Sequence, residues 1–129
     1  MTVVEQIVAR QTAAVIVYES DQVIAFADHD PINPGHILVC PKLPFATLLE
    51  VPAVVLAEIN DVAKVIYARI EAKFSPDGIT LVQNNGHVNE LNHYHLHIIP
   101  RYKNDTFQFA RAGQNLQSQE QLQAALADF

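Results

Sequence analysis

Three histidines alternate with apolar residues in one short run, from His93 to Ile99. Successive side chains of a β-strand point to opposite faces, so a strand here would place His93, His95 and His97 on one face. The apolar residues between them would then face a core. The pattern therefore predicts a strand with one core-facing side. On its other side lies a row of imidazoles, which can act as nucleophiles, hydrogen-bond donors or metal ligands.

Length and composition fit one globular domain, because the chain has 129 residues, of which 50% are hydrophobic and 17% charged. A net charge of −6 with neutral histidine argues against nucleic acid or an anionic membrane as the main partner. No apolar run approaches the length of a membrane span, and the first residues do not resemble a secretory signal. The single cysteine, Cys40, excludes an intramolecular disulfide. A cytoplasmic location is the simplest expectation.

Hydrophobic periodicity and turn residues predict an antiparallel α+β domain. We expect a short amphipathic helix over residues 3–10, a long helix over 52–74 and a terminal helix over 118–127. Five segments are rich in β-branched or apolar residues and are bounded by turn residues, which is typical of strands. The expected strands cover residues 13–18, 23–26, 36–40, 79–83 and 93–101.

The row of histidines has more than one chemical interpretation. A neutral imidazole can attack an electrophile near neutral pH, and a protonated one can stabilise an anion. His95 could attack phosphorus and carry a covalent intermediate, while His97 donates to a phosphate oxygen. His93 could donate through its side chain or orient His95 through its backbone carbonyl. Alternatively, His-x-His pairs on a strand can chelate zinc, or the three side chains can be ordinary surface or core residues.

The run from His93 to Arg101 resembles the His-φ-His-φ-His-φ-φ signature of the histidine triad (HIT) superfamily, in which φ is an apolar residue. Residues 25–42 and 81–86 also resemble conserved stretches of that family, in the same order. The likeness covers most of the chain, from about residue 2 to residue 102. The chain is therefore identified as a member of the HIT superfamily.

This resemblance implies an architecture and an assembly. The fold would be the HIT-like α+β fold, with an antiparallel sheet of about five strands, one long helix and a short N-terminal helix. A single HIT domain would span residues 1–129, with its core over about 2–102 and a tail over 103–129. The family is typically homodimeric, pairing sheets through strand and long-helix contacts. The implied ligand is a purine nucleotide or a nucleotide conjugate.

The resemblance also implies a reaction at the α-phosphate of a nucleotide, in phosphoanhydride, phosphoramidate or related bonds. His95 would be the nucleophile that forms a nucleotidyl-histidine, which water then cleaves. His97 would bind the phosphate, His93 would support the site, and His36 matches the family's separate fourth histidine. This chemistry requires no metal or other cofactor, although the four histidines could capture zinc adventitiously.

A second set of residues matches the nucleotide-binding positions of the family. Asp28 matches a carboxylate that binds ribose hydroxyls, and Asn84 matches an asparagine near the ribose and phosphate. Asp28 could instead simply cap a turn. Four apolar residues match the wall around the base. These are Val3, Val4, Ile7 and Phe26.

The loop before the triad departs from the family pattern, which has Gly-Gln-Ser/Thr where this chain has Val88, Asn89 and Glu90. Asn89 could replace a lost amide contact with the nucleotide. The carboxylate of Glu90 would repel a phosphate, so we expect it to point outward, to form a salt bridge, or to mark a different substrate geometry. His29 replaces an aliphatic residue, and we expect it in a loop near the rim of the pocket.

Three functions are compatible with these patterns. The first is a hydrolase or nucleotidyl transferase that acts at an α-phosphate through His95. The second is a Fhit-like hydrolase of dinucleoside polyphosphates. The third, outside catalysis, is a nucleotide- or zinc-binding regulatory protein with little turnover.

Overall fold

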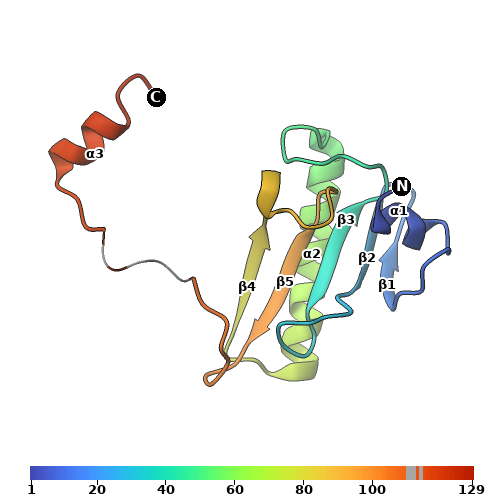
Figure 1. The fold of residues 1–129 in the computed structure, drawn as a ribbon. Helices are drawn as coiled ribbons and strands as arrows, with labels where there is room; N and C mark the ends of the chain where they lie inside the picture. Colours follow the sequence, from blue (N-terminus) through green and yellow to red (C-terminus); the bar gives the residue numbers. More distant parts are fainter. Residues whose placement is uncertain (110–112, 114) are drawn as a thin grey trace.

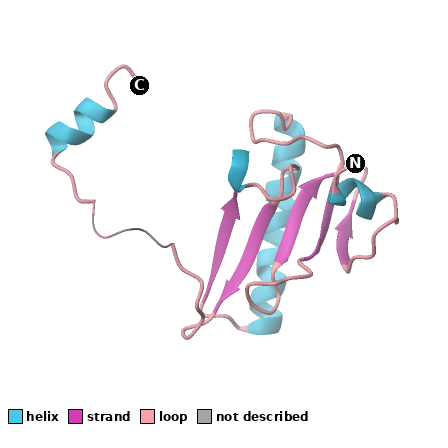
Figure 2. Cartoon of the chain, viewed as in Figure 1, coloured by secondary structure: helices cyan, strands magenta, loops and turns pink. Residues whose placement is uncertain are grey.

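The computed structural model describes residues 1–109, 113 and 115–129. Figure 1 shows the arrangement of the helices and strands, and Figure 2 colours the same view by type. In chain order the elements are α1 (Val3–Val8), β1 (Ile16–Glu19), β2 (Val23–Ala27), β3 (Ile37–Pro41), α2 (Ala53–Phe74), β4 (Gly78–Gln83), the short 3-10 helix η1 (Gly86–Val88), β5 (Leu96–Arg101) and α3 (Gln119–Ala125).

The strands form one five-stranded sheet in the order β1-β2-β3-β5-β4. Every neighbouring pair is antiparallel, so the predicted α+β fold with an antiparallel sheet is confirmed. β5 lies between β3 and β4, with His97 opposite Leu38 on one side and Val82 on the other. Strand β3 is thus held beside a strand that follows it by more than fifty residues in the chain. This pairing places the loop before β3 next to the triad.

The long helix α2 covers one face of the sheet, and α1 lies over part of the other (Figure 1). The apolar repeat predicted for α2 is buried against the sheet, together with Leu96 and Ile98 of β5. A smaller cluster lies on the α1 side, and its members come from α1, β2 and β3. They are Val4, Ile7, Ile24, Phe26, Leu38 and Cys40. The imidazole of His97 therefore lies on the face that α2 does not cover.

Strand β5 begins at Leu96, three residues later than the sequence pattern predicts. The backbone N–H of Tyr94 donates to the carbonyl of Phe45 at 2.7 Å, so this part of the run bonds to the segment before α2 instead of to the sheet. The side chains nevertheless alternate as expected, because Tyr94 is buried in the α2-side core with Leu96. The prediction of a strand over residues 93–95 was wrong, and the prediction of the alternation is confirmed.

The end of the chain forms α3, whose N-terminus carries a capping box between Ser118 and Gln121. All residues of this helix are exposed, and the tail extends away from the sheet (Figure 1). Among the described residues, no helix is long and apolar enough to span a bilayer. The part of the chain that positions the triad is therefore the sheet with α1 and α2.

Candidate active site

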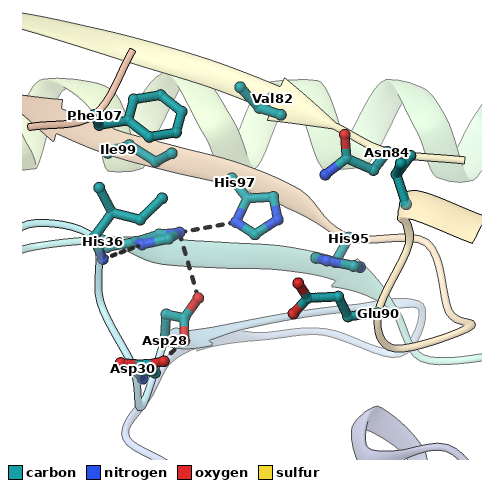
Figure 3. Close-up of a pocket in the computed structure, with 12 residues that line it drawn as sticks. Asp28, Asp30, His36, Val82, Asn84, Glu90, His95, His97, Ile99 and Phe107 are labelled. Carbon is teal, nitrogen blue, oxygen red and sulfur yellow. Dashed lines mark hydrogen bonds and ion pairs between the residues drawn. The ribbon is translucent and has the colours of Figure 1, made fainter. Parts of the chain in front are cut away.

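A cleft opens on the sheet face that α2 leaves uncovered. It consists of two adjoining cavities of about 300 and 350 Å³, which share several polar lining residues (Figure 3). The shared residues are Asp28, Asp30, Glu90, His95 and His97. Two members of the triad and three carboxylates therefore meet at the centre of the cleft.

The ring of His95 is held in one tautomer by the backbone. Its Nδ1 lies 2.8 Å from the carbonyl oxygen of His93. A carbonyl can only accept a hydrogen bond, so Nδ1 must carry the proton. In the neutral ring Nε2 then has a free lone pair, which makes it the nucleophilic atom. The predicted role of the His93 carbonyl in orienting His95 agrees with this geometry.

The ring of His97 is held in the opposite tautomer by a chain of hydrogen bonds. The backbone N–H of Ile32 donates to Nδ1 of His36 at 3.1 Å, so the proton of a neutral His36 is on Nε2. Nε2 of His36 lies 2.9 Å from Nδ1 of His97 and donates to it. His97 must therefore carry its own proton on Nε2. The cleft thus offers a lone pair from His95 and an N–H donor from His97.

Burial favours the neutral forms of His97 and His36. Desolvation is the main cause that lowers the pKa of His97 to about 4, and the neighbouring charges of His95 and His36 add to it. The pKa of His36 is also lowered, mainly by desolvation, although Asp28 opposes the shift. Oδ2 of Asp28 is 3.5 Å from Nε2 of His36. Near neutral pH His97 is therefore a neutral hydrogen-bond donor.

His93 is fully buried and has no free ring nitrogen. Its Nε2 donates to the carbonyl of Pro41 at 2.7 Å, so its Nδ1 accepts from the hydroxyl of Thr2 at 2.8 Å. Thr2 is also the N-cap of α1, where it forms a capping box with Glu5. His93 therefore ties α1 to the end of β3 and acts on the site through its carbonyl.

The loop before β3 needs a glycine next to His36. Gly35 has a φ of +92°, and a Cβ there would lie 2.9 Å from the ring of Phe74 at the end of α2. Glycine alone tolerates both this conformation and this close approach. The loop can therefore pack against α2 and deliver His36 to His97.

A family model described as the HIT domain matches residues 9–104. The chain belongs to the HIT family. The resemblance inferred from the triad is thus confirmed.

Relatives and solved structures agree with this assignment. An uncharacterized HIT-like protein of Methanocaldococcus jannaschii is 41% identical over 103 residues, which cover 78% of each chain. The adenylylsulfatase HINT3 of Arabidopsis thaliana is 32% identical over 102 residues, which are 78% of this chain and 52% of that enzyme. The chain therefore spans about half the length of that enzyme. Membership of the HIT family supports a nucleotide-related activity.

Among solved structures, a HIT family protein from Bacillus anthracis superposes with a TM-score of 0.84 at 33% identity and covers 98% of this chain and 93% of its own. A Zn-bound histidine triad family protein from Mycobacterium smegmatis has a TM-score of 0.76 at 29% identity, with 98% and 94% covered. These superpositions show that the chain adopts the HIT fold.

The residues expected to bind the nucleotide divide between the cleft and the core. Asp28 and Asn84 line the first cavity, and Asp28 also caps a turn, because its Oδ1 accepts from the N–H of Asp30 at 3.0 Å. The apolar wall lines the second cavity, with the exception of Val4, which is fully buried in the α1-side core. The members in the wall are Val3, Ile7 and Phe26.

The side chain of Asn89 points inward from the loop before the triad and does not line the cleft. Its amide nitrogen is 3.2 Å from the carbonyl of Ala46 and 3.3 Å from that of His93, and its oxygen accepts from the N–H of Leu91 at 3.0 Å. These bonds satisfy the backbone around His93. Asn89 therefore supports the carbonyl that orients His95.

Glu90 lines both cavities, beside His95 (Figure 3). The inward turn of Asn89 leaves Glu90 on the cleft side of the loop. Its carboxylate forms no ion pair with any residue that the structure describes. The expectations that it points outward or forms a salt bridge were therefore wrong, and a different substrate geometry remains. His29 is exposed and lines the second cavity, as expected for a rim residue.

One group of the described residues could hold a metal ion. Ligand atoms of Asp28, His36 and His97 lie within 4.8 Å of one another, and nitrogen and carboxylate ligands suit zinc. His93 does not fit such a site, because both of its ring nitrogens are bonded within the protein. Of the four histidines expected to capture zinc, two therefore belong to this group.

Proposed function

We propose that this HIT protein hydrolyses or transfers a nucleotide at its α-phosphate through a covalent nucleotidyl-His95. The observation that carries the proposal is the pair of opposite tautomers, which the backbone carbonyl of His93 and the Ile32–His36 chain impose. Together they supply a nucleophilic lone pair and a phosphate donor in one cleft. A purine nucleotide or nucleotide conjugate is the proposed substrate.

In the first step, Nε2 of His95 would attack the α-phosphorus, and the leaving group would depart with the electron pair of its bond. The Nε2–H of His97 would donate to a phosphate oxygen as negative charge develops there. Because Nδ1 of His95 keeps its proton on the His93 carbonyl, the modified ring would carry a positive charge. In the second step, water would form the new bond to phosphorus, lose a proton, and release His95 as a neutral ring.

A homodimer in the cytoplasm is the proposed state of this protein. The outer strand β4 and the outer side of α2 present exposed apolar side chains, among them Leu81 and Tyr67. These residues border one shallow cavity, which supports a contact with a second copy at this edge. A free buried thiol, Cys40, fits a reducing compartment.

A zinc-regulated form is a second candidate, supported by the Asp28–His36–His97 group and by the Zn-bound relative from Mycobacterium smegmatis. Bound zinc would occupy ring nitrogens that otherwise fix the proton of His97. We therefore propose that zinc lowers turnover and that catalysis needs no metal. Activity that survives dialysis against a chelator supports this, and activity restored only by added zinc contradicts it.

Hydrolysis of dinucleoside polyphosphates is less favoured by the charges of the cleft. A polyphosphate would meet the carboxylates of Asp30 and Glu90, which line both cavities. Like charges close together repel. A substrate with one phosphate next to an uncharged or positive group fits better.

The test is a variant of the nucleophile. The change His95→Ala should lower kcat by at least about a thousandfold and abolish a labelled adduct from a nucleotide that carries ³²P at the α-position. The control is His87→Ala, because His87 is exposed on η1 and lines neither cavity. Hydrolysis that survives His95→Ala, or an adduct on another residue, would refute the covalent mechanism.

A further inference from the structure

An aromatic side chain from the tail, Phe107, forms part of the cleft. It lines the first cavity together with Ile32, Val82 and Ile99 (Figure 3). The sequence pattern did not single out Phe107, since it lies beyond the stretch that resembles the family. The next aromatic residue, Phe109, is 80% exposed, and its ring centroid lies 6.2 Å from that of Phe107.

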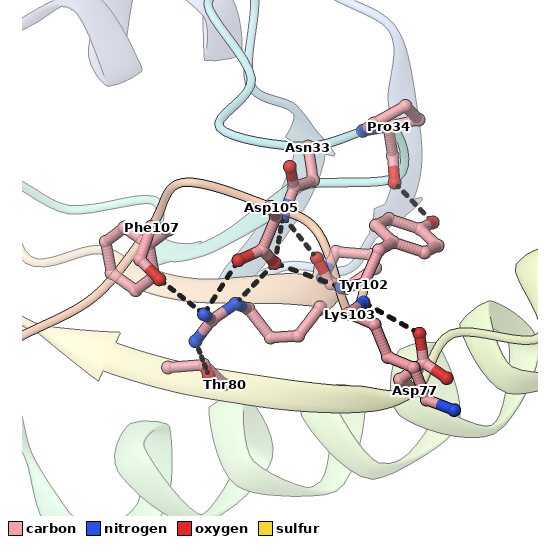
Figure 4. Close-up of polar contacts among 10 residues, drawn as sticks. Asn33, Pro34, Asp77, Thr80, Tyr102, Lys103, Asp105 and Phe107 are labelled. Atoms are coloured by element: carbon pink, nitrogen blue, oxygen red, sulfur yellow. Dashed lines mark hydrogen bonds and ion pairs between the residues drawn. The ribbon is translucent and has the colours of Figure 1, made fainter.

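Phe107 lies in a network of polar contacts near Asp105 and Thr80 (Figure 4), and Arg101 at the end of β5 holds it there. The guanidinium lies over the ring of Phe107, with 4.9 Å between its central carbon and the ring centroid, and it donates to the Phe107 carbonyl. The same guanidinium forms two hydrogen bonds with Asp105, at 2.8 and 2.9 Å, and one with Thr80 at 3.1 Å. Arg101 thus fixes both the backbone and the ring of Phe107.

Asp105 stabilises the turn between Arg101 and Phe107 through further hydrogen bonds. Its Oδ2 also accepts from the side chain of Asn33 and from the backbone N–H of Tyr102. The hydrogen bond from Arg101 is the main cause that holds the pKa of Asp105 well below its usual range. Asp105 therefore stays ionised near neutral pH and can keep its contacts with Arg101.

The order of residues along β5 places Phe107 opposite the nucleophile. His95, His97 and Ile99 follow one another on the same face, and Phe107 lies with Ile99 at the far end (Figure 3). The His95 and His97 rings are 4.7 Å apart, and His97 is in contact with His36 beyond it. In a displacement at phosphorus, the leaving group departs on the side opposite the nucleophile. A phosphate bound by His97 would therefore direct its leaving group towards Phe107.

We propose that Phe107 is the specificity-determining wall of a leaving-group subsite, and that the natural leaving group carries a hydrocarbon or aromatic part. This inference rests on the proposed function. An aromatic ring with Ile32, Val82 and Ile99 around it gains from contact with apolar surface, which sulfate, phosphate or ammonia does not offer. Arg101 is the positioning residue for this wall.

The experiment compares two substrates that share the same bond type. Adenosine 5′-(N-benzyl)phosphoramidate and unsubstituted adenosine 5′-phosphoramidate differ only in the benzyl group on nitrogen. The change Phe107→Ala should lower kcat/KM for the benzyl compound by about tenfold and leave the unsubstituted one within about twofold. Because each variant is compared with the unaltered protein, the intrinsic reactivities of the two compounds cancel.

Two further variants separate a subsite from a general loss of structure. Phe129→Ala removes an exposed aromatic ring of the same tail that lines neither cavity, and it should leave both substrates unchanged. Arg101→Lys removes the two-bond contact with Asp105 and should reproduce the selective loss seen with Phe107→Ala. Equal losses on both substrates, or no loss with Phe107→Ala, overturn the inference. Failure to turn over either compound, with no adduct on His95, would instead overturn the proposed function.

Discussion

The two walls of the cleft differ in how firmly their polar groups are held. At the starts of β3 and β5, the rings of His36, His95 and His97 have their protons fixed by backbone groups or by one another. On the loop side, the carboxylates of Asp30 and Glu90 line the cleft without a hydrogen bond to any other described residue. The difference indicates that the segments at the starts of β3 and β5 set the chemistry, while the loop residues across the cleft select what the chemistry acts on.

The largest expected effect in this comparison comes from removing the hydrogen bond that fixes the proton of His97. The change His36→Phe keeps a ring but removes the donor to His97, which can then move its proton to Nδ1. The cleft would lose an N–H donor to the phosphate, and kcat should fall by about a hundredfold. The measurement is steady-state turnover of a nucleoside phosphoramidate, with a thermal melt to show that the variant is folded.

The matched control for that variant is His87→Phe, because His87 is exposed on η1 and lines neither cavity of the cleft. Its activity should change by less than about threefold. If folded His36→Phe retains full activity, the hydrogen-bond chain does not set the tautomer of His97.

A smaller effect is expected on the loop side. The change Glu90→Gln removes a negative charge next to the phosphate site without changing the shape of the side chain. Binding of the product, a nucleoside monophosphate, should become about fivefold tighter at low salt, and the gain should shrink as salt is added. Calorimetry measures this affinity, and Glu71→Gln on α2 serves as the control. Weaker binding by Glu90→Gln would show that Glu90 contacts the nucleotide as a hydrogen-bond acceptor.

The smallest effect is a gradual dependence of stability on pH. Burial lowers the pKa of His36, His93 and His97 in the folded chain, and that of His97 to about 4. Below about pH 6.5 the unfolded chain therefore binds protons that the folded chain does not. The free energy of unfolding should fall as the pH drops from that value towards about 4.

Urea denaturation at several pH values between about 7.5 and about 5 measures this slope, in a range where carboxylates titrate little. The slope should persist in His29→Asn, because that side chain is exposed. Stability that rises between these pH values would mean that the buried histidines gain partners on protonation.

The sequence predicted the parts of the molecule that follow from local periodicity. The alternation around His95 and the apolar repeat of α2 reflect side-chain burial, which leaves a direct pattern in the chain. The start of β5 was missed because Tyr94 donates to Phe45, a residue far away in the sequence. A strand pattern cannot show which of its N–H groups bonds to a loop.

The site was harder to predict where a role depends on the direction of one side chain. Glu90 was expected to point outward, to form a salt bridge or to mark a different substrate geometry, and the bonds of Asn89 within the loop leave it on the cleft side. Phe107 left no signal, because it enters the cleft only through its contact with Arg101. The i, i+4 pair of Arg101 and Asp105 was the only pattern that could have indicated an ordered turn.

The buried thiol of Cys40 can report how often the folded protein unfolds locally. The thiol is fully enclosed on the central strand β3, and burial raises its pKa, so a thiol reagent cannot react with it in the folded protein. Each modified molecule is one in which that strand has separated from its neighbours. Since β3 continues directly from His36, the rate of modification reports how often the catalytic wall itself comes apart.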